Sequence, residues 1–126
     1  MAKKINIPFM PEFEKPMLTG KKTCTTRTKR YGHAGDYFPA FGKMFVLTDV
    51  YRTVLGRVVN FAYKEEGFDS PQELIAFWNR LHPDVTYEEV RDRLVYIHQF
   101  RPLRKAYPST PGIELYVPLA GVAKPK

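Results

Sequence analysis

The residue types best suited to chemistry are concentrated in residues 20–30, GKKTCTTRTKR, which hold five cations, four threonines and the only cysteine of the 126-residue chain. This mixture presents hydroxyls and positive charge together, as in an anion-binding site or a solvated surface strand. Arg27 is the strongest single candidate for ligand binding, because its planar guanidinium donates paired hydrogen bonds to phosphate, carboxylate or a base edge. An ion pair with Asp36 or Glu66 is its alternative role.

The lone cysteine, Cys24, cannot form an internal disulfide, which fits a reducing compartment. Lys22 and Arg27 are near enough in sequence to lower the pKa of its thiol, so a nucleophilic cysteine is one interpretation. The interpretation we favour is a small, half-buried residue of a strand.

Charge is distributed unevenly along the chain, whose net charge is +7. Residues 1–30 hold eight lysines and arginines against two acids, whereas residues 64–92 hold eight of the thirteen acids against three cations. Such asymmetry is typical of a face that binds a polyanion such as RNA, since phosphate contacts carry most non-specific affinity. A basic protein that is merely soluble has the same signature, and charge alone does not separate the two.

The β-branched residues of the segment 23–28 predict a strand that must position these groups. Strand alternation then divides the side chains between two faces, with Thr23, Thr25 and Arg27 on one and Cys24, Thr26 and Thr28 on the other. Other expected elements are a short strand at 4–7, helical turns at 12–18, a loop within 31–38 that leads to a strand near Tyr37, strands within 43–51 and 52–63 joined at 49–52, a short helix from 86, a strand at 94–100 and an edge strand within 113–119.

The clearest helix is predicted over residues 70–82, where Ser70 is a good N-cap, Pro71 sits at the first helical position and Glu73 completes a capping box. Apolar residues at helical spacing predict a buried stripe, comprising Leu74, Phe77, Trp78 and Leu81. Core packing is the expected role of Trp78, and a base-stacking platform is the alternative.

Strands outnumber helices in this pattern, which predicts one small α+β domain over residues 1–126 with a curved sheet or partial barrel. The proline- and cation-rich residues 101–126 form a C-terminal extension. No apolar run reaches the length of a membrane span and the N-terminus lacks a signal-peptide pattern, so we expect no membrane association and a cytoplasmic location.

Five short motifs occur in an order that resembles the ASCH domain of the PUA-like superfamily. They are LTGKKTCTTR, AGDYF, FVLTDVYRTVLGRVV, EEGFDSPQEL and VYIHQF, and together they span about residues 18–100. The resemblance implies a small PUA-like β-barrel or strongly curved mixed sheet flanked by two or three short helices. It also implies a cleft that binds RNA or a modified nucleoside.

Some members of that family are amidohydrolases that deacetylate N4-acetylcytidine, with a lysine, a threonine and a glutamate as catalytic residues. Carried over by motif, these residues are Lys22, Thr25 and Glu66. An amine, a hydroxyl and a carboxylate can supply the base, nucleophile and proton donor that amide hydrolysis needs. The RNA- or substrate-binding residues expected around them are Lys21, Lys22, Thr23, Arg27, Lys29, Arg30 and Tyr37.

Strand geometry raises a difficulty for this site, because on a regular strand Lys22 and Thr25 point to opposite faces. We therefore expect a bend near Gly20 if they share a cleft. The alternative has both lysines in solvent, Thr25 as an ordinary strand residue and Glu66 as a complement to a helix dipole. Tyr31, Tyr37 and Tyr63 are candidate base-stacking residues or simple packing residues. The three histidines show no ligand spacing and no Gly-rich phosphate loop is present, so we expect no metal and no cofactor.

Overall fold

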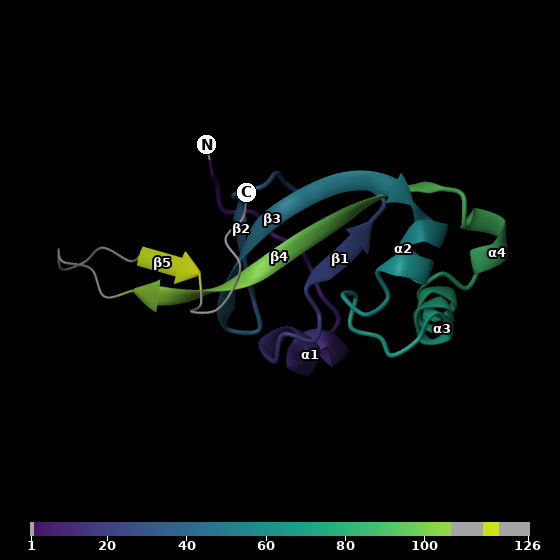
Figure 1. Cartoon of the computed structure of the whole chain (residues 1–126), viewed down its shortest axis with the longest axis horizontal. Helices are drawn as coiled ribbons and strands as arrows, with labels where there is room; N and C mark the ends of the chain where they lie inside the picture. The colour runs from purple at the N-terminus through teal and green to yellow at the C-terminus, as the bar shows by residue number, and fades with distance from the viewer. Residues whose placement is uncertain (1, 107–114, 119–126) are drawn as a thin grey trace.

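The protein, described by a computed structural model over residues 2–106 and 115–118, is built on one antiparallel sheet. Within these residues β4 is central: β1 and β3 flank it, β2 pairs with β3, and β5 pairs with the far end of β4. The long β3 and β4 curve together, so the sheet forms a half-barrel (Figure 1). The strands are β1 Cys24–Arg27, β2 Tyr37–Ala40, β3 Lys43–Val54, β4 Leu94–Ala106 and β5 Leu115–Pro118.

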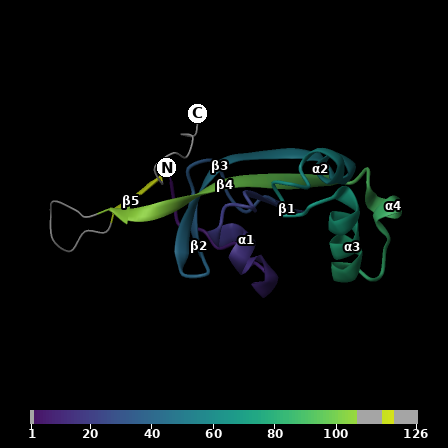
Figure 2. The same ribbon diagram turned by 60° about the horizontal axis from the view of Figure 1, so that its bottom comes forward.

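Short helices pack on this sheet, and they confirm the predicted α+β class. A 3-10 turn, Pro11–Phe13, leads into α1 Glu14–Leu18, and α2 Leu55–Phe61, α3 Pro71–Leu81 and α4 Tyr87–Val90 follow. The last three gather at one end of the sheet, opposite β5 (Figure 1). After rotation, α1 and α3 project from the same side of the sheet (Figure 2).

Two hydrophobic clusters stabilise the fold, and alternate residues of β4 contribute to them. Val95 and Ile97 pack with the buried residues of α2, α3 and α4 in the first cluster. Phe100 packs with Phe38 and other residues of β2, β3 and the N-terminal segment in the second. Because successive strand residues point to opposite faces, the clusters lie on opposite faces of β4. Phe68 packs against both.

The sequence pattern was wrong about residues 52–63, which it assigned to a second strand joined to the first at 49–52. Instead β3 runs unbroken to Val54, with only a bulge between Leu47 and Asp49, and the chain then enters α2. Leu55, Val58 and Val59 are buried at helical spacing against the first cluster. Burial of this stripe outweighs the β preference of the valines.

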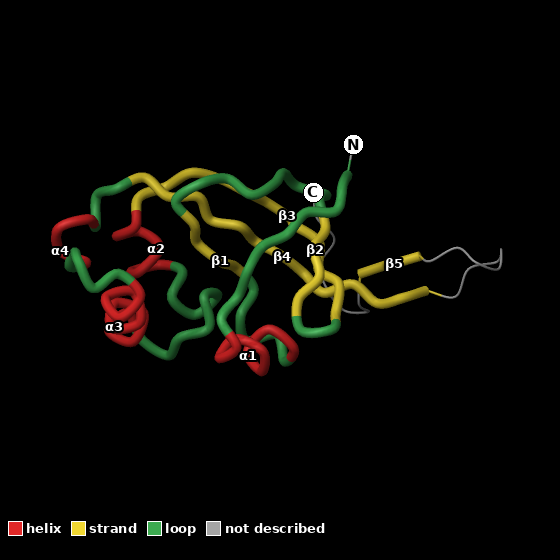
Figure 3. The backbone as a smooth tube through the Cα atoms, turned by 180° about the vertical axis from the view of Figure 1, so that it is seen from behind, coloured by secondary structure: helices red, strands yellow, loops and turns green. Residues whose placement is uncertain are grey.

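Two smaller expectations at the N-terminal end and in the sheet were also wrong. The predicted strand at 4–7 is reduced to one bridge between Lys4 and Tyr37, which is the single parallel pairing among the described residues. Figure 3 shows this N-terminal segment crossing the sheet before it reaches α1. The sheet is therefore antiparallel rather than mixed, apart from that bridge.

Several other predicted elements are confirmed. The strand at 23–28, the helix at 70–82 and the helix after 86 are present with boundaries within about two residues. The Ser70 hydroxyl accepts the Glu73 amide, although the Glu73 carboxylate accepts the amide of Asp69 rather than that of Ser70. Thr86 and Glu89 form the full capping box.

The C-terminal extension takes part in the sheet where it is described. β4 continues past residue 100 to Ala106, and β5 forms the predicted edge strand, which tolerates Pro118. The parts of the extension at 107–114 and 119–126 lie outside the described residues. No helix of the described chain is both long and apolar enough to cross a membrane.

Candidate functional site

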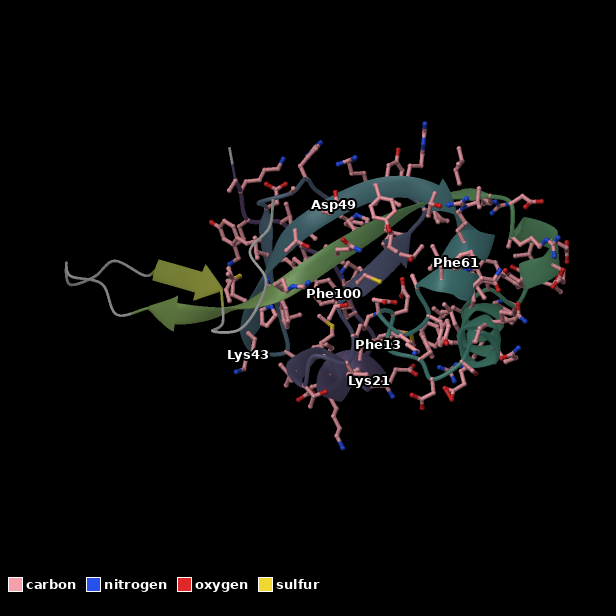
Figure 4. All side chains as sticks on the ribbon, in the orientation of Figure 1. Phe13, Lys21, Lys43, Asp49, Phe61 and Phe100 are labelled. Carbon is pink, nitrogen blue, oxygen red and sulfur yellow. The ribbon has the colours of Figure 1, made fainter. Side chains whose placement is uncertain are left out.

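A cavity of about 450 Å³ lies between the N-terminal segment, β1 and the helices α2 and α3. Its wall is mostly apolar and includes Phe9, Phe13, Phe77 and Trp78, and a cluster of polar side chains borders one side of it. Figure 4 shows Phe13 between α1 and the segment that connects α2 to α3. The polar lining residues are Lys22, Thr25, Thr26, Arg27, Thr28, Glu66 and His82.

A buried ion pair between Lys22 and Glu66 lies at the centre of these polar lining residues. Lys22 Nζ lies 3.2 Å from Glu66 Oε1 and donates a second hydrogen bond, 2.9 Å long, to the Glu66 backbone carbonyl. Lys22 is 2% exposed and Glu66 5% exposed, so both charges are removed from water. The Lys22 ammonium also lies 4.4 Å from the centre of the Phe13 ring. Burying two charges is costly, and each stabilises the other.

The turn between α2 and α3 carries Glu66 to this position. Its backbone is secured to β1, because the carbonyl of Glu65 accepts the amides of Thr23 at 2.7 Å and Cys24 at 3.1 Å. Gly67 follows with φ of +102°, a conformation that favours glycine. A Cβ there would lie 3.2 Å from the Cβ of Lys22, so the turn and the lysine are in close contact. Glu66 thus lies in a turn and not at the first residue of a helix, so it is not the complement to a helix dipole that the alternative interpretation assigned.

Three side chains from the β1 segment converge on the Glu66 carboxylate. Besides Lys22, the hydroxyl of Thr26 donates a hydrogen bond to Oε2, and the Cys24 thiol lies 3.7 Å from the same oxygen. Positions 22, 24 and 26 share a face because strand side chains alternate with a period of two. Burial raises the pKa of the Cys24 thiol well above its ordinary value, and the Glu66 charge adds to this while Lys22 opposes it. Cys24 is fully buried, not half-buried as expected, and its thiol is protonated.

Arg27 occupies the opposite face of β1 and forms neither the ion pair with Asp36 nor the one with Glu66 that we considered. Its guanidinium donates to the Thr25 hydroxyl, to the Thr26 carbonyl at 3.0 Å and to the Pro8 carbonyl at 2.6 Å. It also lies 5.3 Å from the centre of the Phe9 ring. Burial lowers the pKa of Arg27, and the charge of Glu66 opposes that shift. Arg27 therefore ties the N-terminal segment to the strand.

The position of β1 at the edge of the sheet resolves the difficulty of opposite faces. Thr25 and Arg27 on one face and Lys22 and Thr26 on the other all line the same cavity. A cavity that extends around an edge strand meets both faces, so Lys22 and Thr25 share it although no direct hydrogen bond joins them. Gly20, with φ of +82°, forms the expected turn before the strand.

The α3 stripe was expected to be buried, yet only Leu74 is. Phe77 and Trp78 are half-buried and Leu81 is exposed, and all three line the cavity. The Trp78 ring packs 4.3 Å from the ring of His82, centre to centre. Trp78 had been considered as a base-stacking platform, whereas Phe77, Leu81 and Thr26 were missed as part of the site. The alternation of β1, which puts residue 26 on the same face as residue 22, was the signal that could have found Thr26.

The remaining candidate binding residues do not line the cavity. Lys21 forms an exposed ion pair with Asp69 at 3.1 Å, Thr23 is held through its backbone, and Tyr37 is half-buried in β2. Lys29 and Arg30 are exposed and lie over the rings of Tyr31 and Tyr96. Tyr31 and Tyr63 are half-buried and also lie outside the cavity wall.

Other ionisable groups have structural roles. Asp36 accepts the amides of Lys3 and His33, which organises the turn before β2. Burial alone would raise the pKa of Asp36, but these hydrogen bonds outweigh it and hold the pKa below its ordinary value. Among the described residues no cluster of three or more His, Cys, Asp or Glu side chains is arranged to hold a metal ion.

The curled antiparallel half-barrel with short helices defines a class of small α+β domains, and solved structures place this chain within it. The sequence matches no protein-family model and no curated protein. An ASCH domain from Lactobacillus crispatus superposes with a TM-score of 0.59 over 80% of this chain and 79% of that one, at 13% identity. A mutant ASCH protein from Zymomonas mobilis gives 0.51 over 82% and 74%, at 18% identity. A protein from Enterococcus faecalis gives 0.54 over 80% and 78%, at 15% identity.

The chain therefore has the fold of these ASCH domains, as the sequence motifs predicted. At these identities the likeness concerns the fold, and the chemistry of the cavity has to be argued from its own residues.

Proposed function

We propose that the protein binds a single nucleobase in this cavity, presented by a modified nucleoside or by an unpaired nucleotide of RNA. The observation that carries the proposal is a cavity of about 450 Å³ with aromatic walls and one polar side. That volume falls in the range of about 300–1,000 Å³ typical of small-molecule sites. A planar base matches such a wall, and donors and acceptors at one side can read its edge.

The aromatic wall supports stacking of a base. Phe77 and Trp78 come from α3 and Phe9 from the N-terminal segment, and all three border the cavity. Stacking on an aromatic side chain is worth about 1–3 kcal/mol per base. Exposed cations outside the cavity, Lys29 and Arg30, would contact the phosphates when the base belongs to RNA.

A second candidate function, hydrolysis of an N-acyl group from the base, is favoured by the contacts of Glu66. A carboxylate that touches a hydroxyl and an ammonium at the edge of an apolar cavity is the arrangement of an acyl-transfer site. N4-acetylcytidine, the substrate that the ASCH resemblance implies, has an amide on a planar base. Lys22, Thr25 and Glu66 are the catalytic residues that the resemblance implies.

Titration of the intrinsic fluorescence tests the binding proposal directly, because Trp78 is the only tryptophan and lines the cavity. N4-acetylcytidine, cytidine and a short single-stranded RNA would each be added, and released cytidine would be followed by chromatography. We expect saturable quenching by at least one of them, and for RNA an affinity that falls with added salt. Failure of all three to change the emission at low salt, with no binding by calorimetry, would exclude the proposed ligand class.

A further inference from the structure

The two adjacent threonines of β1 have different partners at the cavity. Thr26 Oγ1 donates its proton to Glu66 Oε2, whereas Thr25 Oγ1 accepts a hydrogen bond from Arg27 Nη1. Among the described residues no carboxylate or imidazole contacts the Thr25 hydroxyl. A hydroxyl becomes a nucleophile when a base lies within hydrogen-bonding distance of it. The contact that activation requires is made at residue 26.

Access to the cavity also differs between the two residues. Thr26 is half-buried and Thr25 is 2% exposed, although both border the cavity. Lys22 occupies the other oxygen of Glu66, Oε1, at 3.2 Å, which leaves Oε2 to the hydroxyl. The competing nucleophile, Cys24, is buried with a raised thiol pKa and stays protonated. Thr26 is thus the reactive oxygen that both reaches the cavity and contacts a base.

We propose that Thr26 is the nucleophile of acyl transfer in this cavity, with Glu66 as its general base and Lys22 as the residue that positions Glu66. This inference rests on the hydrolytic function proposed above, and it assigns the nucleophile to Thr26 instead of Thr25. Thr25, bound to Arg27, then positions the guanidinium on the wall of the cavity.

The reaction balances with water as the only co-reactant. Glu66 Oε2 takes the Thr26 proton while Oγ1 forms a bond to the acyl carbon of the N-acyl base. The carbon–nitrogen bond breaks, Glu66 returns the proton to the departing amine, and an ester of Thr26 remains. Water then attacks the ester, Glu66 accepts one proton from water, and this proton passes to Oγ1 as the acid leaves.

Matched variants separate the two threonines. Thr25→Val and Thr26→Val remove one hydroxyl each, Thr53→Val makes the same change at a half-buried position of β3 outside the cavity wall, and Thr26→Ser keeps a hydroxyl at residue 26. Release of cytidine from N4-acetylcytidine and acyl release from p-nitrophenyl acetate would be measured for each. Acylation of the protein would be located by peptide mass spectrometry, and folding checked by circular dichroism.

We expect Thr26→Val to lose about a hundredfold or more in turnover, because it lacks both the nucleophilic oxygen and the proton that Glu66 accepts, and Thr26→Ser and Thr53→Val to keep most of it. The acyl group should be found on residue 26. Acylation at Thr25, or full turnover by a folded Thr26→Val variant, would overturn the assignment. If p-nitrophenyl acetate acylates Thr26 while N4-acetylcytidine is neither bound nor cleaved, the nucleoside function fails and the assignment of Thr26 stands. Absence of acyl release from both compounds would overturn the assignment.

Discussion

Lys22 and Glu66 are 44 residues apart in the sequence, and their side chains meet at 3.2 Å in a buried ion pair. Water has little access to either charge, because the side chains of Lys22 and Glu66 are only 1% and 7% exposed. Around this pair the protein places three threonines, an arginine and an aromatic wall. The strength of the pair can be measured in several ways.

Removing one member of the pair should destabilise the protein strongly. Lys22→Met or Glu66→Gln leaves the partner buried with its charge uncompensated, which costs about 3–5 kcal/mol in unfolding free energy. The double variant Lys22→Met/Glu66→Gln should be more stable than the sum of the single losses predicts. Denaturant titrations would give these values.

Lys21→Met is the matched control, because its ion pair with Asp69 is exposed and contributes less than about 1 kcal/mol. A Glu66→Gln variant as stable as the wild type would contradict the expectation.

Gly67 is expected to be intolerant of a side chain. Gly67→Ala adds a Cβ 3.2 Å from the Cβ of Lys22 at a φ of +102°, so strain and displacement of the lysine combine. The left-handed backbone conformation alone costs a residue with a Cβ about 1–2 kcal/mol of stability. The control, Gly35→Ala, also has positive φ, +96°, but its Cβ would meet nothing within 4 Å. We expect the Gly67 variant to lose both stability and ligand affinity, and the Gly35 variant only stability. Equal affinities for the two variants would show that the Gly67 contact does not matter to the site.

The tie between Arg27 and the N-terminal segment can be tested by amide hydrogen exchange. Arg27→Lys cannot donate simultaneously to the Pro8 carbonyl and the Thr25 hydroxyl as the guanidinium does, so residues 8–13 should exchange faster. Arg30→Lys serves as the control, since its guanidinium contacts Gly32 and Val50 instead. Unchanged exchange in the Arg27 variant would show that packing of Phe9 alone holds the segment.

Stability should fall in mild acid because of His98. The fully buried ring accepts the Tyr31 amide at Nε2, 3.0 Å away, and protonation there would break that bond. Burial lowers the pKa of His98 below its ordinary 6.5, the nearby backbone at Thr25 and Tyr96 opposes the shift, and the charges of Arg27 and Arg30 add to it. The folded state therefore binds fewer protons than the unfolded state, and the contribution present above pH 6.5 decreases as the pH falls below it.

The difference between the wild type and His98→Gln isolates this contribution, since glutamine keeps an acceptor and does not titrate. Urea midpoints would be compared at about pH 7.5 and pH 5. We expect the wild type to lose more stability than the variant over this interval. The Asp36 carboxyl does not interfere, because its pKa lies below 3.8 and its contribution is lost only in stronger acid. Parallel losses in the two proteins would mean that another group is responsible.

Short sequence patterns were enough to predict α3 and β1. Ser70 and Pro71 mark the start of α3, and the threonines of 23–28 give β1, because caps and β-branched runs act within a few residues. Residues 52–63 were misassigned because Leu55, Val58 and Val59 fit a strand by composition and a helix by spacing. Packing against Val95 and Ile97, far away in sequence, decides between them.

The site was predictable in part for a similar reason. The motif resemblance selected Lys22, Thr25 and Glu66, and the chemistry of the guanidinium selected Arg27; the structure brings all four to one cavity. The resemblance could not select Thr26, whose contact with Glu66 depends on where the turn after α2 meets β1. The exposure of Trp78 likewise depends on how far α3 stands from the N-terminal segment, which no local pattern encodes.

The placement of the cavity across both hydrophobic clusters has a consequence for heat resistance. Leu55, Leu74 and Val95 of its wall belong to one cluster and Phe13 to the other. A bound base would touch both at once, and binding to the native state alone adds about RT ln(1 + [L]/Kd) to its free energy relative to the unfolded chain. The melting temperature should accordingly climb with ligand concentration, so a thermal-shift screen of nucleosides reports occupancy without any assay of turnover.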